Sequence, residues 1–316
     1  MKCPALLAAL ASFGLGACTA TNGLDEYDSS RAVSIDAPRS AAARAEAVDP
    51  ALWQVADGDT TIYILGTFAM LPEEYEWRTR TIDAAIAASD TLVLETRSDP
   101  EGQRALGERM AAIGLDRNLP PLLQRVDPAL RPTLSTLAAR TGVTMQTYDV
   151  MENWAAAITL MGAHSRTLGL TELAGTDPDL RAAFAEAGKP IDYLATNDDQ
   201  LALYDGLSVE AQRALLESAI LTNDELKADF GDRLAAWTRG DLAAIDGSFN
   251  RYLEPDSALR EAVLTLRNTA WVQWIRARLA TPGAVFLAVP ANHLVGEDSL
   301  LTMLERNGLA VSRLDE

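Results

Sequence analysis

Residues 60–72 read TTIYILGTFAMLP, a short apolar run that breaks at a glycine and continues into a turn. Residues 284–296, AVFLAVPANHLVG, repeat this pattern with a proline in place of the glycine. A helical pattern and a second apolar run follow each copy, the second runs being 91–95 and 309–314. Short apolar runs beside turn residues are typical of buried strands. The sequence therefore predicts two strand-turn-helix-strand units that bracket the folded chain.

The rest of the chain is predicted to add a hairpin and many helices. Apolar runs at 52–55 and 61–65 flank Asp-Gly-Asp, which predicts a β-hairpin, and 71–88 is predicted to be helical. Apolar residues recurring every three or four positions indicate helices at 101–113, 128–141, 153–169, 178–188, 197–205, 208–221, 224–239 and 256–280, with a short strand at 191–194. We therefore expect an α/β fold, with a central mixed sheet built from the two end units and a mainly helical middle insert.

The amino terminus has the pattern of an export signal. Lys2 is followed by an apolar run too short to span a membrane and then by Leu-Gly-Ala-Cys, which ends at Cys18. This pattern predicts a lipoprotein signal peptide over 1–17 and acylation of Cys18, and cleavage near Ala20 as an ordinary signal peptide stays an alternative. Thr19 favours the outer membrane, facing the periplasm. We therefore expect a protein of the cell envelope, anchored to a membrane by lipid.

Composition separates a tether from a folded domain. Residues 18–48 are rich in Ala, Ser, Asp and Arg without any period, which predicts a flexible tether, and 49–316 is predicted to be one folded domain. The formal net charge is −18, from 45 acidic and 27 basic residues, so we expect no nucleic-acid partner. Cys3 leaves with the signal peptide, which leaves no second cysteine for a disulfide. A hydrophobic core must therefore stabilise the domain.

Few side chains in the sequence are candidates for chemistry. The chain has two histidines. His164 lies in a largely apolar segment, which favours a buried structural histidine, whereas His293 lies in a turn after a buried strand, where imidazole can bind metal or move protons. Glu95 ends the strand predicted at 91–95, at the kind of sheet edge that borders ligand crevices. Both positions also fit structural roles.

At these residues the sequence resembles the TraB/PrgY/GumN family, which includes Wnt-inactivating metalloproteases of animals and bacterial envelope proteins. The similar stretches are LWQVADGDTTIYILGTFAMLP, IDAAIAASDTLVLET and the segment from RNTAWVQW to AVSRL, so the resemblance spans about 52–314. It implies a site with two G-x-x-H turns, a glutamate after the first unit and an Arg-Asn pair before the second. The corresponding positions here are Gly66 with Ala69, Glu95, Arg267 with Asn268, and Pro290 with His293.

The resemblance implies a metal-assisted, peptidase-like hydrolase. Histidines and the glutamate would hold a divalent metal ion, the glutamate would activate water, and the arginine would stabilise developing negative charge. Here the implied ligands are His293 and Glu95, and because Ala69 carries no donor, the fold would have to supply Asp177 or His164 as a third. Ala195 replaces a further family glutamate. We therefore predict a pseudoenzyme with weak or no hydrolysis.

The sequence leaves three alternatives to a pseudoenzyme. The first is an active hydrolase that uses another residue in place of the missing histidine. The others are a binding module for a peptide or small ligand such as haem, and a structural partner in envelope assembly. The sequence has no G-x-S-x-G elbow, no H-E-x-x-H motif, no G-x-G-x-x-G motif and no P-loop. These absences argue against a serine hydrolase and against nucleotide cofactors.

Overall fold

A computed structural model describes residues 48–170, 174–253 and 256–314. The predicted signal peptide, Cys18 and the tether up to residue 47 therefore lie outside the described residues. Of the described residues, 98–170 and 197–227 form one compact unit, and the others form a second. The single domain predicted over 49–316 stays a prediction.

The second unit is built on a mixed sheet with the strand order β4-β3-β5-β2-β1-β6. The strands are β1 (Leu52–Ala56), β2 (Thr60–Thr67), β3 (Thr91–Leu94), β4 (Ile191–Tyr193), β5 (Gly283–Pro290) and β6 (Val311–Leu314). The predicted hairpin is confirmed, because β1 and β2 pair antiparallel with Val55 opposite Ile62. The central strand β5 runs parallel to β2 and β3, and β3 runs parallel to β4. The two predicted end units therefore supply most of one sheet.

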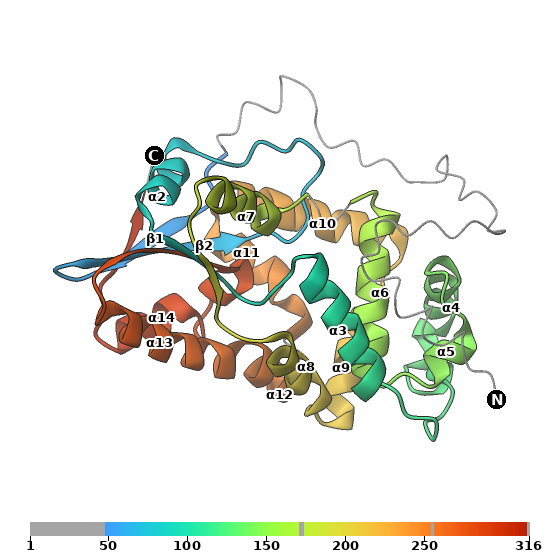
Figure 1. The fold of residues 1–316 in the computed structure, drawn as a ribbon. Helices are drawn as coiled ribbons and strands as arrows, with labels where there is room; N and C mark the ends of the chain where they lie inside the picture. The colour runs from blue at the N-terminus through green and yellow to red at the C-terminus, as the bar shows by residue number, and fades with distance from the viewer. Residues whose placement is uncertain (1–47, 171–173, 254–255, 315–316) are drawn as a thin grey trace. The chain divides into compact units, whose positions relative to one another are not determined.

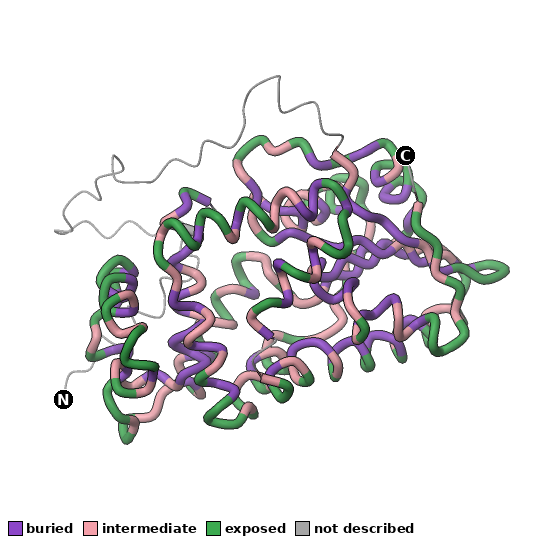
Figure 2. The backbone as a smooth tube through the Cα atoms, turned by 180° about the vertical axis from the view of Figure 1, so that it is seen from behind, coloured by how far each residue is buried: buried purple, intermediate pink, exposed green. Residues whose placement is uncertain are grey.

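Helices cover both faces of this sheet (Figure 1). On one face, α13 (Leu266–Leu279) and α14 (Leu300–Arg306) share a hydrophobic core with strand residues such as Ile64 and Leu287. On the other face lie α2 (Arg80–Ala88) and α7 (Thr176–Glu186), where the rings of Phe184 and Phe286 are 6.2 Å apart. Figure 2 shows the central strands as a nearly continuous buried run, with an exposed hairpin tip. The strands alternate their side chains between two cores, which explains their continuous apolar sequence.

The helix predicted over 256–280 contains a π-helical turn. It consists of α12 (Ser257–Arg260), the π turn Glu261–Thr265 and α13. Each residue turns an α-helix by about 100°. The extra residue of a π turn therefore rotates the helix before the turn by about 100° relative to the helix after it. This rotation brings Leu259 onto the same buried face as Arg267 and Trp271. A uniform α-helix would have turned Leu259 away from the core.

The helix predicted over 71–88 begins only at Arg80, so the first part of that prediction is wrong. Pro72 and the positive φ of Glu74, 59°, keep the chain irregular after β2. The hydroxyl oxygen of Thr79 then accepts a hydrogen bond from the amide of Ile82 and caps the helix. The remaining helices of this unit are α10 (Asn223–Thr238), which begins in the first unit, α11 (Leu242–Phe249) and the 3₁₀ turns η5 (Arg251–Leu253) and η7 (Ala291–Leu294).

The first unit confirms the predicted helical insert. Its elements are α3 (Pro100–Ile113), η3 (Leu122–Gln124), η4 (Pro128–Leu130), α4 (Arg131–Arg140), α5 (Met145–Asp149), α6 (Asn153–Thr167), α8 (Asn197–Asp205) and α9 (Val209–Ser218). Trp154 on α6 is fully buried. Arg125 donates to the carbonyl oxygens of Met151 and Tyr148, at 2.7 and 3.0 Å, and so ties η3 to the loop before α6.

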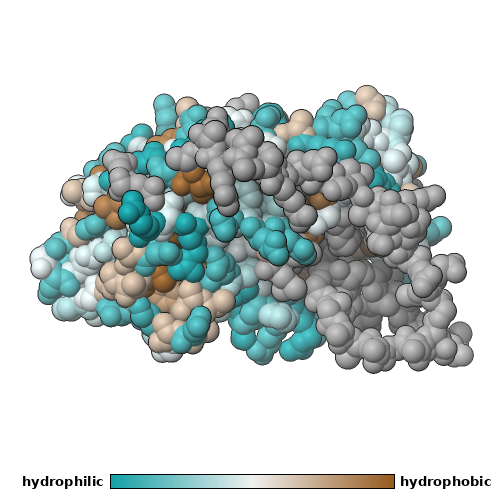
Figure 3. Space-filling view, turned by 90° about the horizontal axis from the view of Figure 1, so that it is seen from above, coloured by the Kyte–Doolittle hydropathy of each residue, from teal (hydrophilic) through white to brown (hydrophobic). Residues whose placement is uncertain are grey.

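The described surface is strongly polar. In Figure 3 hydrophilic residues dominate the visible face, and apolar residues form only small separate patches. Within the described ranges, no helix has both the length and the apolar character needed to cross a membrane.

Candidate functional site

The sheet brings the predicted site residues to one edge. Because β2, β3 and β5 are parallel, the turns that follow them leave the sheet on the same side, at the edge where α/β folds bind ligands. Thr67 of β2 pairs with Pro290 of β5, and Leu94 of β3 pairs with Ala288. Ala69, Glu95 and His293 follow the ends of these three strands. The fold therefore assembles the candidate site from segments far apart in sequence.

The turn after β5 packs closely against β2. Pro290 ends the strand with φ −53°, a value that proline itself prefers, so a glycine is not required there. The 3₁₀ turn η7 that follows is entirely buried. At Gly66 a Cβ atom would lie 3.1 Å from Cα of Ala291, closer than ordinary packing. Glycine at position 66 is what allows the two turns to approach.

Asn268 fixes the orientation and tautomer of His293. The side-chain NH₂ of Asn268 donates to the carbonyl oxygens of Asp298, at 2.7 Å, and of His293, at 3.4 Å. The amide oxygen of Asn268 therefore faces Nδ1 of His293, at 2.8 Å. Because that oxygen can only accept, the network assigns the proton to Nδ1. The lone pair of the imidazole is then on Nε2, the atom that could bind a metal or a proton.

His293 and Arg267 both contact the indole ring of Trp271. The imidazole of His293 lies 4.5 Å from the indole of Trp271, and the guanidinium of Arg267 lies 4.9 Å from the same indole. His293 is 1% exposed. Burial, reinforced by the positive charge of Arg267, lowers the pKa of His293 well below its usual value. The imidazole is therefore neutral at pH 7.

Arg267 binds the carboxylate of Glu95. The two side chains form an ion pair whose members are only 9% and 12% exposed. A buried guanidinium needs an anionic partner, because an unpaired charge of either sign is costly in the protein interior. Cation–π contact with Trp271 holds the guanidinium from a second side. Glu95 is thus engaged by a fixed cation from the protein itself.

Asp177, at the first turn of α7, adds a second carboxyl group beside Glu95. Burial, followed by the negative charge of Glu95, raises the pKa of Asp177 to about 6. The hydroxyl groups of Thr176 and Thr67 hydrogen-bond to this carboxyl group and oppose the rise. The sequence indicates Asp177 only as a possible third metal ligand, and no motif in it indicates Thr67. The one feature that could have indicated Thr67 is its position at the end of a strand.

The turn after β2 is held by the segment before α7. The amide of Phe68 donates to Oγ1 of Thr176, at 3.1 Å, and the amide of Thr176 donates to the carbonyl of Phe68, at 3.2 Å. The amide of Leu71 donates to the carbonyl of Ala174. A Cβ atom on Gly175 would overlap the carbonyl oxygen of Ala69. The backbone at Ala69 is therefore fixed, although its methyl side is exposed.

The side chains at this edge do not fit a divalent metal ion. Among the described residues, no three His, Cys, Asp or Glu side chains come together in a group that could bind one. Ala69 supplies no donor atom, and the carboxylate of Glu95 is already paired with the guanidinium of Arg267. Three protein ligands are usual for a catalytic zinc ion. The Nε2 lone pair of His293 alone does not make such a site.

The structure thus unites most of the predicted site residues. Gly66, Glu95, Arg267, Asn268, Pro290 and His293 share contacts around one sheet edge. Ala195, in place of the family glutamate, lies beside Glu95, because its amide donates to the Glu95 carbonyl at 3.0 Å. His164 lies on α6 in the first unit and is buried, as expected for a structural histidine. Trp271 is buried and contacts both Arg267 and His293.

Comparison with known proteins gives few relatives. The chain is 26% identical to the protein YbaP of Escherichia coli K12 over 195 residues, which cover 59% of this chain and 70% of YbaP. YbaP of Shigella flexneri matches to the same extent. Both are described as uncharacterized, and no solved structure matches.

A family model gives the broader assignment. The model of the TraB/PrgY/gumN family matches residues 51–313, which contain the whole sheet edge described above. Its span agrees with the resemblance seen in the sequence between about 52 and 314. The chain belongs to the TraB/PrgY/gumN family.

Proposed function

We propose that this chain is a lipid-anchored protein of the cell envelope that binds a peptide or another small ligand at the sheet edge without hydrolysing it. The lipid would be attached at Cys18, and the folded part would face the periplasm. The hydrolytic metal centre that the family resemblance implied would be absent. The site would then be a degenerate form of a metallopeptidase-like site.

One observation supports this proposal: the carboxylate of Glu95 is already paired with the guanidinium of Arg267. A glutamate that pairs with a buried guanidinium is a poor metal ligand, because its oxygens are already engaged by a fixed cation. Ala69 offers no replacement donor. Hydrolysis would need a ligand set that these residues do not provide, whereas binding needs only a crevice with fixed polar groups.

His293 fits the same proposal. Its ring packs against Trp271 and its Nδ1 atom is bound by Asn268. His293 is therefore a rigid, buried support of the sheet edge. A haem ligand needs an accessible ring beside a large flat cavity, and His293 is 1% exposed. The haem alternative therefore gains no support from this residue.

Metal content tests the absence of a hydrolytic centre. The full-length chain would be purified without chelator, beside a His293→Ala variant, and both would undergo elemental analysis. We expect metal far below one ion per chain in both proteins. One ion per chain in the wild type that disappears in the variant would overturn the proposal and indicate an active hydrolase.

Peptide retention tests the binding activity. A mixture of short peptides would be passed over immobilised full-length protein, and bound peptides would be eluted and sequenced by mass spectrometry. We expect a subset to be retained and recovered intact. Cleaved peptides that need His293 would contradict the non-hydrolytic assignment, and no retention at all would contradict peptide binding.

Lipid attachment is tested separately. A Cys18→Ala variant should no longer incorporate radiolabelled fatty acid, because acylation needs the cysteine sulfur. A variant that still incorporates the label would show that Cys18 is not the site of lipid attachment.

A further inference from the structure

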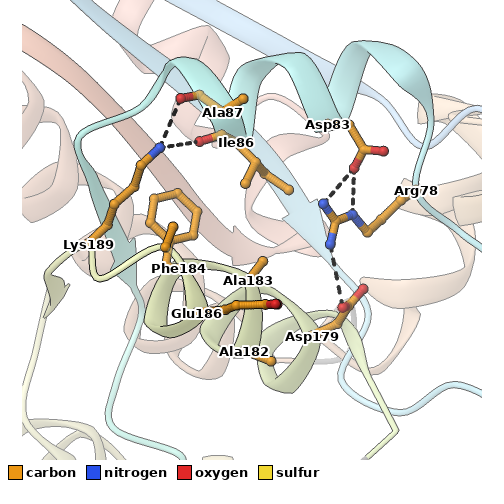
Figure 4. A pocket seen from close by; sticks show the side chains of 11 residues that line it. Arg78, Asp83, Ile86, Ala87, Asp179, Ala182, Ala183, Phe184, Glu186 and Lys189 are labelled. Atoms are coloured by element: carbon orange, nitrogen blue, oxygen red, sulfur yellow. Dashed lines mark hydrogen bonds and ion pairs between the residues drawn. The ribbon is translucent and has the colours of Figure 1, made fainter.

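A hollow between α2 and α7 lies apart from the site at the sheet edge (Figure 4). Its volume is about 430 Å³, within the range of roughly 300–1,000 Å³ typical of small-ligand pockets. None of the residues that line it belongs to the set around His293 and Glu95. It therefore offers a second, independent place for a ligand.

The floor of the hollow is apolar. Ala182 and Ala183 of α7 and Ala187 just after it are at least partly exposed there, whereas Ile86 of α2 and Phe184 of α7 are buried. Alanine side chains are short, so they leave room between the helices without adding polar groups. A chain of methylene groups is the kind of ligand that such a floor covers best.

Both basic groups of the hollow are already engaged. Nζ of Lys189 donates to the carbonyl oxygens of Ile86 and Ala87, at 3.1 and 2.9 Å, at the C-terminal end of α2. Arg78 lies 2.6 Å from the carboxylate of Asp83 and 3.6 Å from that of Asp179. Arg78 is therefore paired with carboxylates, whereas Lys189 keeps its positive charge at the end of α2.

Carboxylate oxygens, in contrast, remain available. The side chains of Asp83 and Asp179 are 54% and 40% exposed, and Arg78 engages one oxygen of each. The exposed Glu186 forms no ion pair with any described residue. Three acidic and two basic side chains line the hollow of a chain whose net charge is −18. These charges favour a cationic ligand.

We propose that the hollow binds an alkylammonium group, presented as the lysine side chain of a peptide. The methylene chain would lie over Ala182, Ala183 and Ala187, which are at least partly exposed. The ammonium group would reach the carboxylates of Asp179 and Glu186. A lysine side chain combines an apolar stem with a charged end, as this lining requires.

Nuclear magnetic resonance titration of the full-length chain tests the proposal with two probes of the same shape. Nα-acetyl-lysine methylamide carries the ammonium group, and Nα-acetyl-norleucine methylamide carries the methylene chain without it. We expect the lysine probe to shift the amide resonances of α2 and α7 and the norleucine probe to bind about fivefold more weakly. Equal binding of both probes, or no shift at α2 and α7, would overturn the proposal.

Variants locate the binding group. Replacing both Asp179→Asn and Glu186→Gln should weaken the lysine probe about fivefold, whereas Asp232→Asn, at an exposed site on α10, should leave its affinity unchanged. Equal losses in the two proteins would mean that only the overall charge of the chain matters, which would refute a specific site. Binding of free 1,5-diaminopentane more tightly than the lysine probe would overturn the peptide as the source. The hollow and the sheet edge share no lining residue, so this outcome is independent of the metal and peptide-retention tests.

Discussion

The turns after β2 and after β5 follow paired parallel strands with the same apolar pattern, yet the protein uses them differently. The β5 turn buries His293 and surrounds it with Asn268 and Trp271. The β2 turn exposes Ala69 and instead buries the neighbouring Phe68, whose ring packs against three other aromatic side chains. A polar side chain with fixed partners therefore lies in one turn, and an apolar anchor beside an exposed methyl group lies in the other. The comparison indicates that the two turns are stabilised in different ways.

Four changes to the chain would test this contrast. The greatest effect should come from the side chain that supports the β5 turn. Trp271→Ala should lower the free energy of unfolding by about 3–5 kcal/mol, because the indole is buried and contacts both His293 and Arg267. Urea denaturation followed by circular dichroism measures this change. Trp274→Ala, on the same helix but only partly buried, is the matched control and should cost clearly less.

The second prediction concerns the carboxyl group beside the β2 turn. The pKa of Asp177 is about 6 in the folded protein, above its ordinary value near 4, so the folded state holds a proton that the unfolded state releases. Stability from this group is present below pH 4 and is lost as the pH rises to about 6. Asp177→Asn removes that loss, and at pH 7 it should be more stable than the wild type by up to about 2 kcal/mol.

Denaturation midpoints of both proteins at pH 4 and pH 7 check the Asp177 prediction. The difference between variant and wild type should be larger at pH 7. Asp179→Asn, two residues further along α7, is the control for removing an acidic residue of the same helix. An Asp177→Asn difference that does not grow with pH would be inconsistent with a raised pKa.

The third prediction gives the β5 turn the opposite dependence on pH. The pKa of His293 is lowered in the folded state, so the unfolded state binds its proton first as the pH falls. Stability from this group is present above about pH 6.5 and is lost on acidification. In His293→Gln, whose amide can still donate to Asn268, the loss of stability between pH 7 and pH 5 should be smaller than in the wild type. A parallel loss in both proteins would contradict a buried neutral imidazole.

The fourth prediction is the smallest. Ala69→Ser changes only an exposed side chain in the β2 turn, so the free energy of unfolding should move by no more than about 0.5 kcal/mol. Thermal unfolding measured by calorimetry is sufficient. Gly175→Ala supplies the contrast, because its new methyl group would overlap the carbonyl oxygen of Ala69 and must destabilise the turn. A large effect of Ala69→Ser would mean that this side chain has a role that its exposure does not indicate.

The apolar pattern of the chain predicts the central strands, and the family resemblance predicts most of the residues at the sheet edge. The apolar run at 62–65 and its repeat at 285–289 can be satisfied only by burial on both faces, so they had to form central strands. The resemblance then indicated Glu95, Arg267, Asn268 and His293 before any geometry was known. Local signals also located the helical insert, because glycines and prolines end its helices.

The tertiary structure alone decided what these residues contact. Arg267 lies 172 positions from Glu95 in the chain, and no local pattern pairs a helix guanidinium with a strand-end carboxylate. The same holds for the raised pKa of Asp177, which depends on burial and on the negative charge of Glu95, which follows β3. The π turn that places Leu259 and Trp271 on one face likewise interrupts the helix that the sequence predicts as uniform. Charge and burial depend on distances through space, and only the fold sets those distances.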